Sequence, residues 1–269
     1  MELRFDKYEG LGNDFVVVGV DFSSIGEEVA IRLCDRHLGV GADGVLFAGV
    51  EGGRPYMRVR NADGSSPEMC GNGVRCVALH LRRSGLVASN EFELDTDAGP
   101  HLVHVLDDDR VRVGMRPPSL APSDLPLQSS EPWLDEPISV AGHDLRVTAV
   151  SMGNPHAVTF DAELDRQRIG PALERDPRFP RGVNVGFAAV KPGELELAVW
   201  ERGVGWTRAC GTGACAAGVA AVETGRAERG EIQRVALPGG VLDIRVDGPG
   251  APVHMTGPAR HVFSGVISL

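Results

Sequence analysis

Two cysteines stand in the same local setting at two distant places of this 269-residue chain. Cys70 is followed by Gly71-Asn72-Gly73 and Cys210 by Gly211-Thr212-Gly213, an offset of 140 residues (210 − 70). After each motif apolar residues recur at helical spacing, so each cysteine is predicted to precede a helix. Because backbone N–H groups at a helix N-terminus favour negative charge, we expect both thiol pKa values to fall from about 8.5 toward neutrality.

A cysteine at a helix start has three interpretations: a structural residue, a redox centre or an acid/base group. A redox pair usually lies on one helix as C-x-x-C, whereas Cys70 and Cys210 lie in separate motifs. If the two motifs face each other, one thiol takes a proton from one face of a carbon and the other delivers a proton to the opposite face. That arrangement inverts an amino-acid Cα. The anion formed there would be met by the backbone N–H groups of the same two glycine-rich loops.

Neither a cofactor nor a metal is expected. Pyridoxal phosphate, the common cofactor for this chemistry, needs a lysine, and neither Lys7 nor Lys191 lies beside a phosphate-binding loop. The spacings Cys70-x5-Cys76 and Cys210-x4-Cys215 differ from that of a zinc knuckle. The other three cysteines, Cys34, Cys76 and Cys215, are expected in apolar cores as reduced thiols.

The offset near 140 extends beyond the cysteines and predicts two structurally equivalent halves. Asn61 and Glu201 each stand nine residues before their cysteine (70 − 61 and 210 − 201). Gly12-Asn13 matches Gly153-Asn154 at an offset of 141 (153 − 12). More loosely, the segment 39–45 matches 182–188 at an offset of 143 (182 − 39). A period of this length indicates a duplicated domain rather than a solenoid repeat.

The elements that position these residues are mostly strands, which gives an α+β class with one buried helix in each half. Alternating strands over 56–61 and 194–200 deliver Asn61 and Glu201 to strand ends. A first helix is expected over 27–38, with a capping box of Ser24 and Glu27. The segment 117–137 contains six of the 18 prolines and is interpreted as the linker between the halves.

Composition excludes several classes of function. The net charge of −10 and the pI near 5.3 argue against nucleic-acid binding. No apolar run approaches the length of a membrane helix, and the first residues lack the apolar core of a signal peptide, so a cytoplasmic protein is expected.

Several motifs together resemble the diaminopimelate epimerase family over nearly the whole chain, from Gly10 to Leu269. They are Leu11-Gly12-Asn13-Asp14-Phe15, Asn61-Ala62-Asp63-Gly64, Cys70-Gly71-Asn72-Gly73-Val74-Arg75-Cys76, Met152-Gly153-Asn154-Pro155-His156, Glu201-Arg202-Gly203, Ala209-Cys210-Gly211-Thr212-Gly213, Leu237-Pro238-Gly239-Gly240 and Met255-Thr256-Gly257-Pro258. The resemblance implies a cofactor-independent isomerase that interconverts LL- and meso-2,6-diaminopimelate in lysine and cell-wall precursor synthesis.

The resemblance also implies a fold and a site. The fold would be two similar barrel-like domains, each around a central helix, with the active site in the cleft between them. The final strand, 258–269, would return to the first half, 1–116, and the second half would cover 117–257. Cys70 and Cys210 would be the thiol/thiolate pair, and His156 and Glu201 would tune them. The residues implied to bind substrate are Asn13, Asn61, Gly71, Asn72, Asn154, Asn184, Glu201, Arg202, Gly211 and Thr212.

Two positions depart from the pattern of some relatives. Gly44 stands where some carry glutamine, and Phe263 where some carry a tyrosine at a dimer contact. A homodimer is nevertheless expected. The sequence leaves alternatives open: Asn13 alone is typical of a turn, and Glu201 with Arg202 is typical of a surface ion pair. The rival functions are a proline or hydroxyproline racemase on the same fold, and a non-catalytic amino-acid binding module or thiol-redox protein.

Overall fold

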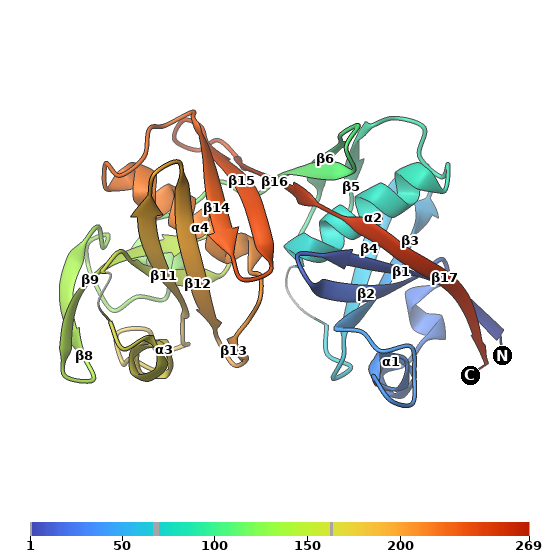
Figure 1. Ribbon diagram of the computed structural model, residues 1–269, viewed down its shortest axis with the longest axis horizontal. Coiled ribbons are helices and arrows are strands. Elements are labelled where there is room, and N and C mark those ends of the chain that lie inside the picture. The colour runs from blue at the N-terminus through green and yellow to red at the C-terminus, as the bar shows by residue number, and fades with distance from the viewer. Residues whose placement is uncertain (1, 67–69, 162–163, 269) are drawn as a thin grey trace. The chain divides into compact units, whose positions relative to one another are not determined.

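The computed structural model describes residues 2–66, 70–161 and 164–268, and the chain forms two compact units (Figure 1). The first unit comprises Met1–Val113 with Thr256–Leu269, and the second comprises Gly114–Met255. None of the described helices is long and apolar enough to span a membrane.

The first unit is built from two groups of strands and two α-helices. Its elements are β1 (Glu2–Gly10), β2 (Asn13–Val18), a 3-10 turn η1 (Phe22–Ser24), α1 (Glu27–Cys34), β3 (Gly44–Glu51), β4 (Arg54–Asn61), α2 (Gly71–Arg83), β5 (Glu91–Leu94), β6 (His101–Val105), β7 (Arg110–Gly114) and β17 (Arg260–Ser268). The main sheet has the order β17-β1-β2-β3-β4, in which only the β2–β3 pair is parallel. Helix α2 packs against this sheet and against β6, so nearly all of its side chains are buried.

The second unit follows the same plan. Its elements are η2 (Pro122–Asp124), β8 (Glu136–Val140), β9 (His143–Ser151), β10 (Pro155–Thr159), α3 (Arg166–Glu174), β11 (Asn184–Lys191), β12 (Glu194–Glu201), β13 (Gly205–Trp206), α4 (Gly211–Glu223), β14 (Ile232–Leu237) and β15 (Gly240–Val246), with β16 (Val253–Pro258) running across the boundary. The strand order β8-β9-β10-β11-β12 again has one parallel pair, β10–β11, and α4 is buried against these strands and β15.

The duplicated α+β fold expected from the sequence is therefore confirmed, with one correction to the register of the repeat. Strands β3 and β11 begin 140 residues apart (184 − 44), and helices α2 and α4 begin 140 residues apart (211 − 71). Gly44 pairs with Phe15 as Asn184 pairs with His156, so Gly44 is the counterpart of Asn184. The match of 39–45 with 182–188 at an offset of 143 was wrong, because it aligned glycines that lie at different places in the loops.

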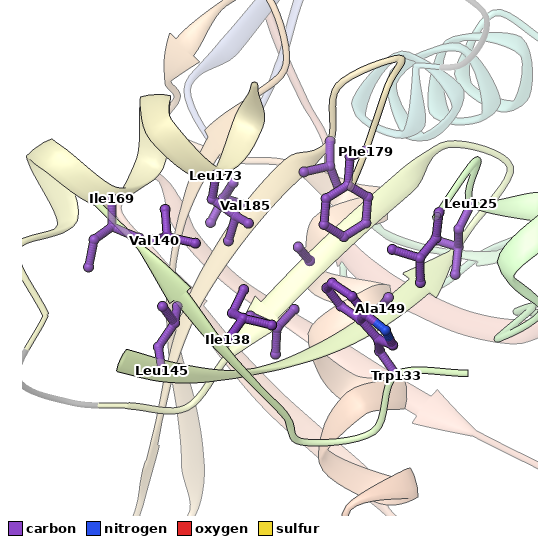
Figure 2. Close-up of a cluster of buried hydrophobic side chains, with 14 of the residues drawn as sticks. Leu125, Trp133, Ile138, Val140, Leu145, Ala149, Ile169, Leu173, Phe179 and Val185 are labelled. Carbon is purple, nitrogen blue, oxygen red and sulfur yellow. The ribbon is translucent and has the colours of Figure 1, made fainter. Parts of the chain in front are cut away.

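The proline-rich segment is not a free linker. Leu125, Leu127 and Trp133 of this segment are buried in the core of the second unit, where Trp133 meets Phe179 edge to face (Figure 2). Burying these apolar side chains stabilises the unit, so the interpretation of 117–137 as a linker was wrong. The domain boundaries at 116/117 and 257/258 stay predictions.

The first helix also differs from expectation. Helix α1 ends at Cys34, because Asp35 leaves helical backbone angles and its carboxylate accepts hydrogen bonds from the N–H groups of His37 and Leu38. Gly26 is the N-cap and makes no side-chain cap bond, so the predicted capping box of Ser24 and Glu27 does not form.

Candidate active site

Cys70 occupies the N-cap of α2, as the sequence predicted. Its Sγ accepts a hydrogen bond from the Gly73 N–H at 3.3 Å, and its carbonyl begins the helix by accepting from Val74. The thiol is partly exposed, whereas Cys76 in the same helix is fully buried. A hydrogen bond from a backbone N–H stabilises a negative charge on sulfur more than it stabilises the neutral thiol. Cys70 is thus suited to hold a thiolate.

Two of the predicted binding residues meet beside this helix start. Asn72 Nδ2 donates to Asn13 Oδ1 at 3.1 Å, which joins the first turn of α2 to the beginning of β2. Asn61 ends β4, as expected, but its amide donates to Ser65 Oγ at 3.0 Å. The first unit therefore brings the Asn13 and Asn72 side chains together, whereas the Asn61 side chain bonds to Ser65 in the loop that follows β4.

Cys210 occupies the N-cap of α4 and differs from Cys70 in its surroundings. Its side chain is only 6 % exposed, and Sγ lies 3.6 Å from Thr212 Oγ1. Burial raises the pKa of the Cys210 thiol well above its ordinary value, and the negative charge of Glu201 raises it further. The expectation that both thiol pKa values fall was therefore wrong for Cys210, because burial outweighs the helix terminus.

Glu201 ends β12 and forms a pair with the Cys210 thiol. Burial raises the pKa of the Glu201 carboxyl, while hydrogen bonds from Thr207 and Cys210 oppose this rise. Thr207 Oγ1 donates to Glu201 Oε1 at 2.5 Å. A buried thiol that donates to a carboxylate is held in its protonated form, so Cys210 is suited to deliver a proton.

His156 lies behind this pair as a neutral ring. Burial, with a smaller contribution from Arg202, lowers the pKa of His156 to about 3. Because the Asn154 Oδ1 atom can only accept a hydrogen bond, the His156 Nε2 atom carries the proton and donates to it at 3.0 Å. Asn154 Nδ2 in turn donates to Thr212 Oγ1 at 3.3 Å. The chain from His156 through Asn154 ends at the residue that contacts the Cys210 sulfur.

Arg202 follows Glu201 in a turn that other side chains hold. The Arg202 N–H donates to Asn184 Oδ1 at 2.9 Å, and Asn184 Nδ2 donates to Pro155 O at 3.0 Å. Glu174 accepts the next N–H, from Gly203, at 2.9 Å. Asn184 is 5 % exposed and acts here as a brace for the turn that carries the guanidinium group.

Gly44 offers no side chain to the site, and the structure gives the reason. A Cβ added at Gly44 would lie 2.8 Å from the Arg60 carbonyl oxygen on the neighbouring strand β4. Such a contact is closer than real Cβ atoms show, so a larger residue would require the backbone of β3 to shift.

Sequence reasoning missed three residues that hold the predicted ones: Thr207, Glu174 and Asp43. Asp43 accepts from Asn13 Nδ2 at 2.6 Å. Thr207 and Glu174 lie outside the aligned positions of the repeat, and Asp43 lies in the loosely matched segment 39–45, so no strong sequence signal singled them out. Within residues 2–66, 70–161 and 164–268, no group of three or more His, Cys, Asp or Glu side chains is placed to hold a metal ion.

The charge beside Cys210 gives a prediction about thiol reactivity. In the Glu201→Gln variant we expect the pKa of the Cys210 thiol to fall, because the neighbouring negative charge is removed. The rate of Cys210 alkylation should therefore rise at lower pH than in the wild type, and at neutral pH it should be about tenfold higher. Iodoacetamide labelling followed by peptide mass spectrometry measures this. Cys70 in the same sample is the internal control, with an unchanged rate. Equal Cys210 rates in both proteins would refute an effect of Glu201.

Comparison with known proteins places this chain in a well-populated group. The family model described as diaminopimelate epimerase matches residues 5–121 and 148–262. The chain is 48 % identical over 275 residues to diaminopimelate epimerase of Desulforudis audaxviator (98 % of both chains) and 44 % identical over 281 residues to that of Acaryochloris marina (99 % of both).

Solved structures share the fold at low sequence identity. A probable proline racemase from Agrobacterium radiobacter superposes with a TM-score of 0.69 at 17 % identity, covering 99 % of this chain and 93 % of the other. A PhzF-family phenazine biosynthesis protein from Bacillus anthracis superposes with a TM-score of 0.71 at 15 % identity, covering 100 % of both. These likenesses show a common fold alone.

Proposed function

This chain belongs to the diaminopimelate epimerase family and interconverts LL- and meso-2,6-diaminopimelate, and we propose that Cys70 and Cys210 are the two groups that exchange the Cα proton. The enzyme is an isomerase of lysine biosynthesis. The observation that carries the proposed mechanism is the equivalence of the two helix starts: each unit presents one cysteine at the N-cap of its buried helix, 140 residues apart (210 − 70).

The two thiols have different resting roles in this proposal. Cys70, which accepts the Gly73 N–H, is the thiolate that removes the proton. Cys210, buried beside Glu201, is the thiol that delivers a proton to the opposite face. After one turnover the protonation states are exchanged, so the reverse reaction uses the same groups in opposite roles. This mechanism requires that both sulfurs reach the same Cα from opposite faces.

The remaining groups match the charges of the substrate. Diaminopimelate carries two carboxylates and two ammonium groups. Backbone N–H groups of Gly71, Asn72, Gly211 and Thr212 would hold the reacting carboxylate at the two helix N-termini. Arg202 would hold the distal carboxylate bidentately, and the amides of Asn13, Asn61, Asn154 and Asn184 would complete the site or brace it. Glu201 would tune the Cys210 thiol directly, and His156 would do so through Asn154 and Thr212.

The direct test is hydrogen exchange with the solvent. Incubation of the enzyme with LL-diaminopimelate in D2O should give meso product with one deuterium at the inverted Cα, measured by NMR and mass spectrometry. L-Proline is the matched control, because it lacks the distal amino-acid head and should gain no deuterium. Exchange on proline but not on diaminopimelate would favour the racemase alternative. No exchange on either substrate would favour a binding module.

The proposed access of both sulfurs to one Cα leads to a prediction about oxidation. A two-electron oxidant such as diamide should convert the Cys70 and Cys210 thiols of the substrate-free enzyme to one disulfide, and the oxidant takes up two electrons and two protons. In a near-attack complex each sulfur lies about 3 to 3.5 Å from Cα, so removing the substrate removes the spacer between them. Peptide mapping without reductant should show the link, and a dithiol should restore activity. Modification of other residues alone would argue against the access of both sulfurs to one Cα.

We also propose a homodimer formed through β17. This edge strand carries three exposed apolar side chains, Val262, Phe263 and Val266, and an unpaired strand edge with apolar side chains favours association with a second copy. Light scattering should give twice the 28.6 kDa chain mass, and Phe263→Glu should shift it toward one chain mass. A monomeric wild-type protein would contradict this. The five free cysteines fit a reducing compartment, and we propose the cytoplasm.

A further inference from the structure

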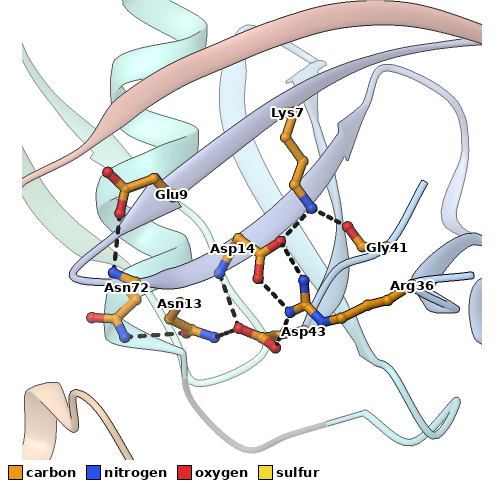
Figure 3. A network of polar contacts seen from close by, with 9 residues as sticks. Lys7, Glu9, Asn13, Asp14, Arg36, Gly41, Asp43 and Asn72 are labelled. Atoms are coloured by element: carbon orange, nitrogen blue, oxygen red, sulfur yellow. Dashed lines mark hydrogen bonds and ion pairs between the residues drawn. The ribbon is translucent and has the colours of Figure 1, made fainter. Parts of the chain in front are cut away.

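The amides of Asn13 and Asn72 lie within one hydrogen-bonded chain that has a cation at one end and a carboxylate at the other. Arg75 donates to Asn72 Oδ1 at 2.8 Å. Asn72 Nδ2 donates to Asn13 Oδ1 at 3.1 Å, and Asn13 Nδ2 donates to Asp43 Oδ2 at 2.6 Å (Figure 3). We propose that Arg75 and Asp43 are positioning residues that lock both amides in the orientation that binds the substrate carboxylate. This inference rests on the function proposed above.

The charges at the two ends dictate the direction of every bond in the chain. A guanidinium group has only donors, so Asn72 must turn its oxygen toward Arg75. An ionised carboxylate has only acceptors, so Asn13 must turn its nitrogen toward Asp43. If either amide flipped, two donors or two acceptors would face each other. In the locked orientation, each amide nitrogen uses one N–H within the chain and has a second N–H to offer an anion.

The cationic end is held rigidly. The Arg75 side chain is completely buried in α2, its Nε donates to Pro258 O at 3.2 Å, and its NH1 donates to Gly71 O at 3.4 Å. A Cβ at Gly10 would lie only 3.2 Å from Arg75 NH2. At the offset of 140, the second unit has Cys215 in place of this arginine (215 − 75). The hydrogen-bonded chain that begins at Arg75 therefore belongs to the first unit, which carries Cys70, and has no such arginine to begin from in the second unit, which carries Cys210.

The anionic end is held from several directions. Arg36 donates to Asp43 Oδ1 at 2.8 Å, which leaves Oδ2 to accept from Asn13 and from the Asp14 N–H. Arg36 also pairs with Asp14, which in turn pairs with Lys7 (Figure 3). The loop before Asp43 is fixed to the end of α1, since the Ala42 N–H donates to Cys34 O at 3.0 Å. The Asp14 N–H therefore holds Oδ2 beside Asn13 whether or not Arg36 contacts the other oxygen.

The test compares Asp43→Asn with a matched control, Arg36→Gln. Asparagine at 43 has the same shape but has a donor as well as an acceptor, so Asn13 is free to flip. We expect its KM for LL-diaminopimelate to rise about tenfold with kcat changed less than about threefold, because the lost contact binds ground and transition states alike. Arg36→Gln removes the ion pair from the other oxygen and should leave KM within about twofold of the wild type.

The other end is tested with Arg75→Met and Arg75→Lys. Methionine removes the donor, whereas lysine keeps one, so the lysine variant should recover most of the KM that the methionine variant loses. A purely structural role would instead lower the melting temperature of both Asp43→Asn and Arg36→Gln without a selective change in KM. An unchanged KM in Asp43→Asn, or equal changes in it and Arg36→Gln, would overturn the inference. If the wild-type protein itself fails to turn over diaminopimelate, the proposed function fails instead.

Discussion

The Cys70→Ala and Cys210→Ala variants should each lose at least about a thousandfold in turnover of LL-diaminopimelate, because each removes a group that transfers the Cα proton. Both should keep the wild-type fold. Alanine fits at either helix start, and losing the cap bond from the Gly73 N–H to the Cys70 sulfur costs about 1 kcal/mol. Steady-state assays in both directions, with circular dichroism and thermal melting on the same samples, measure the two effects separately.

Cys34 and Cys76 provide the matched controls. Both are buried in the first unit, and burial raises the pKa of Cys34 to about 11. Their alanine variants should retain turnover and lose about 1 to 3 kcal/mol of unfolding free energy, as is usual for a small core deletion. Near-wild-type turnover in Cys70→Ala or Cys210→Ala would refute the two-thiol mechanism.

The Gly73→Ala variant should lose about a hundredfold in turnover although the thiol itself remains. A Cβ at Gly73 would lie 2.9 Å from Cys70 Sγ and 3.1 Å from Leu46 Cδ2, so the sulfur must move. Displacement of a reacting atom by about 1 Å is enough for a loss of that size. Gly213→Ala should act in the same way on the other side, since its Cβ would lie 3.2 Å from Cys210 Sγ and 3.1 Å from Val199 Cγ2.

Gly26→Ala is the control for these two variants. Gly26 also stands at a helix start, but in the described part of the chain no heavy atom would lie within 4 Å of an added Cβ, and its φ of −70° suits any residue. Its turnover should equal that of the wild type. The binding of diaminopimelate to each variant, measured by calorimetry, should change less than the turnover. If Gly73→Ala turns over normally, the position of the Cys70 sulfur is not critical.

The helices that matter most could be predicted from the sequence, whereas several strands could not. The apolar spacing after Cys70 and Cys210 and the glycines that follow each helix were strong local signals, and α2 and α4 were confirmed. Strands β3 and β11 were missed because both belong to parallel pairs with buried faces, so their sequences are nearly continuous apolar runs without alternation.

The sequence predicted the positions of the two cysteines at helix starts better than it predicted their electrostatics. The position of Cys210 at a helix start was correct, but the sequence could not show that its thiol would be buried against Glu201. Burial disfavours the charged thiolate, and at Cys210 this effect is larger than the stabilisation of the thiolate by the helix N-terminus. Contacts such as Thr207 with Glu201, or Asp43 with Asn13, depend on the packing of separate loops, which no local pattern encodes.

Strand β17 gives the first unit an unusual order of assembly. In the second unit the edge strand beside β9 is β8, its immediate predecessor in the chain, so strands β8 to β12 can pair as soon as they are synthesised. In the first unit the partner of β1 is Arg260–Ser268. Because synthesis adds about 5 to 20 residues per second, one edge of β1 stays unpaired for tens of seconds before β17 is made. The half that is made first is therefore the half that finishes folding last, and its open edge is the place where a nascent chain would need protection from aggregation.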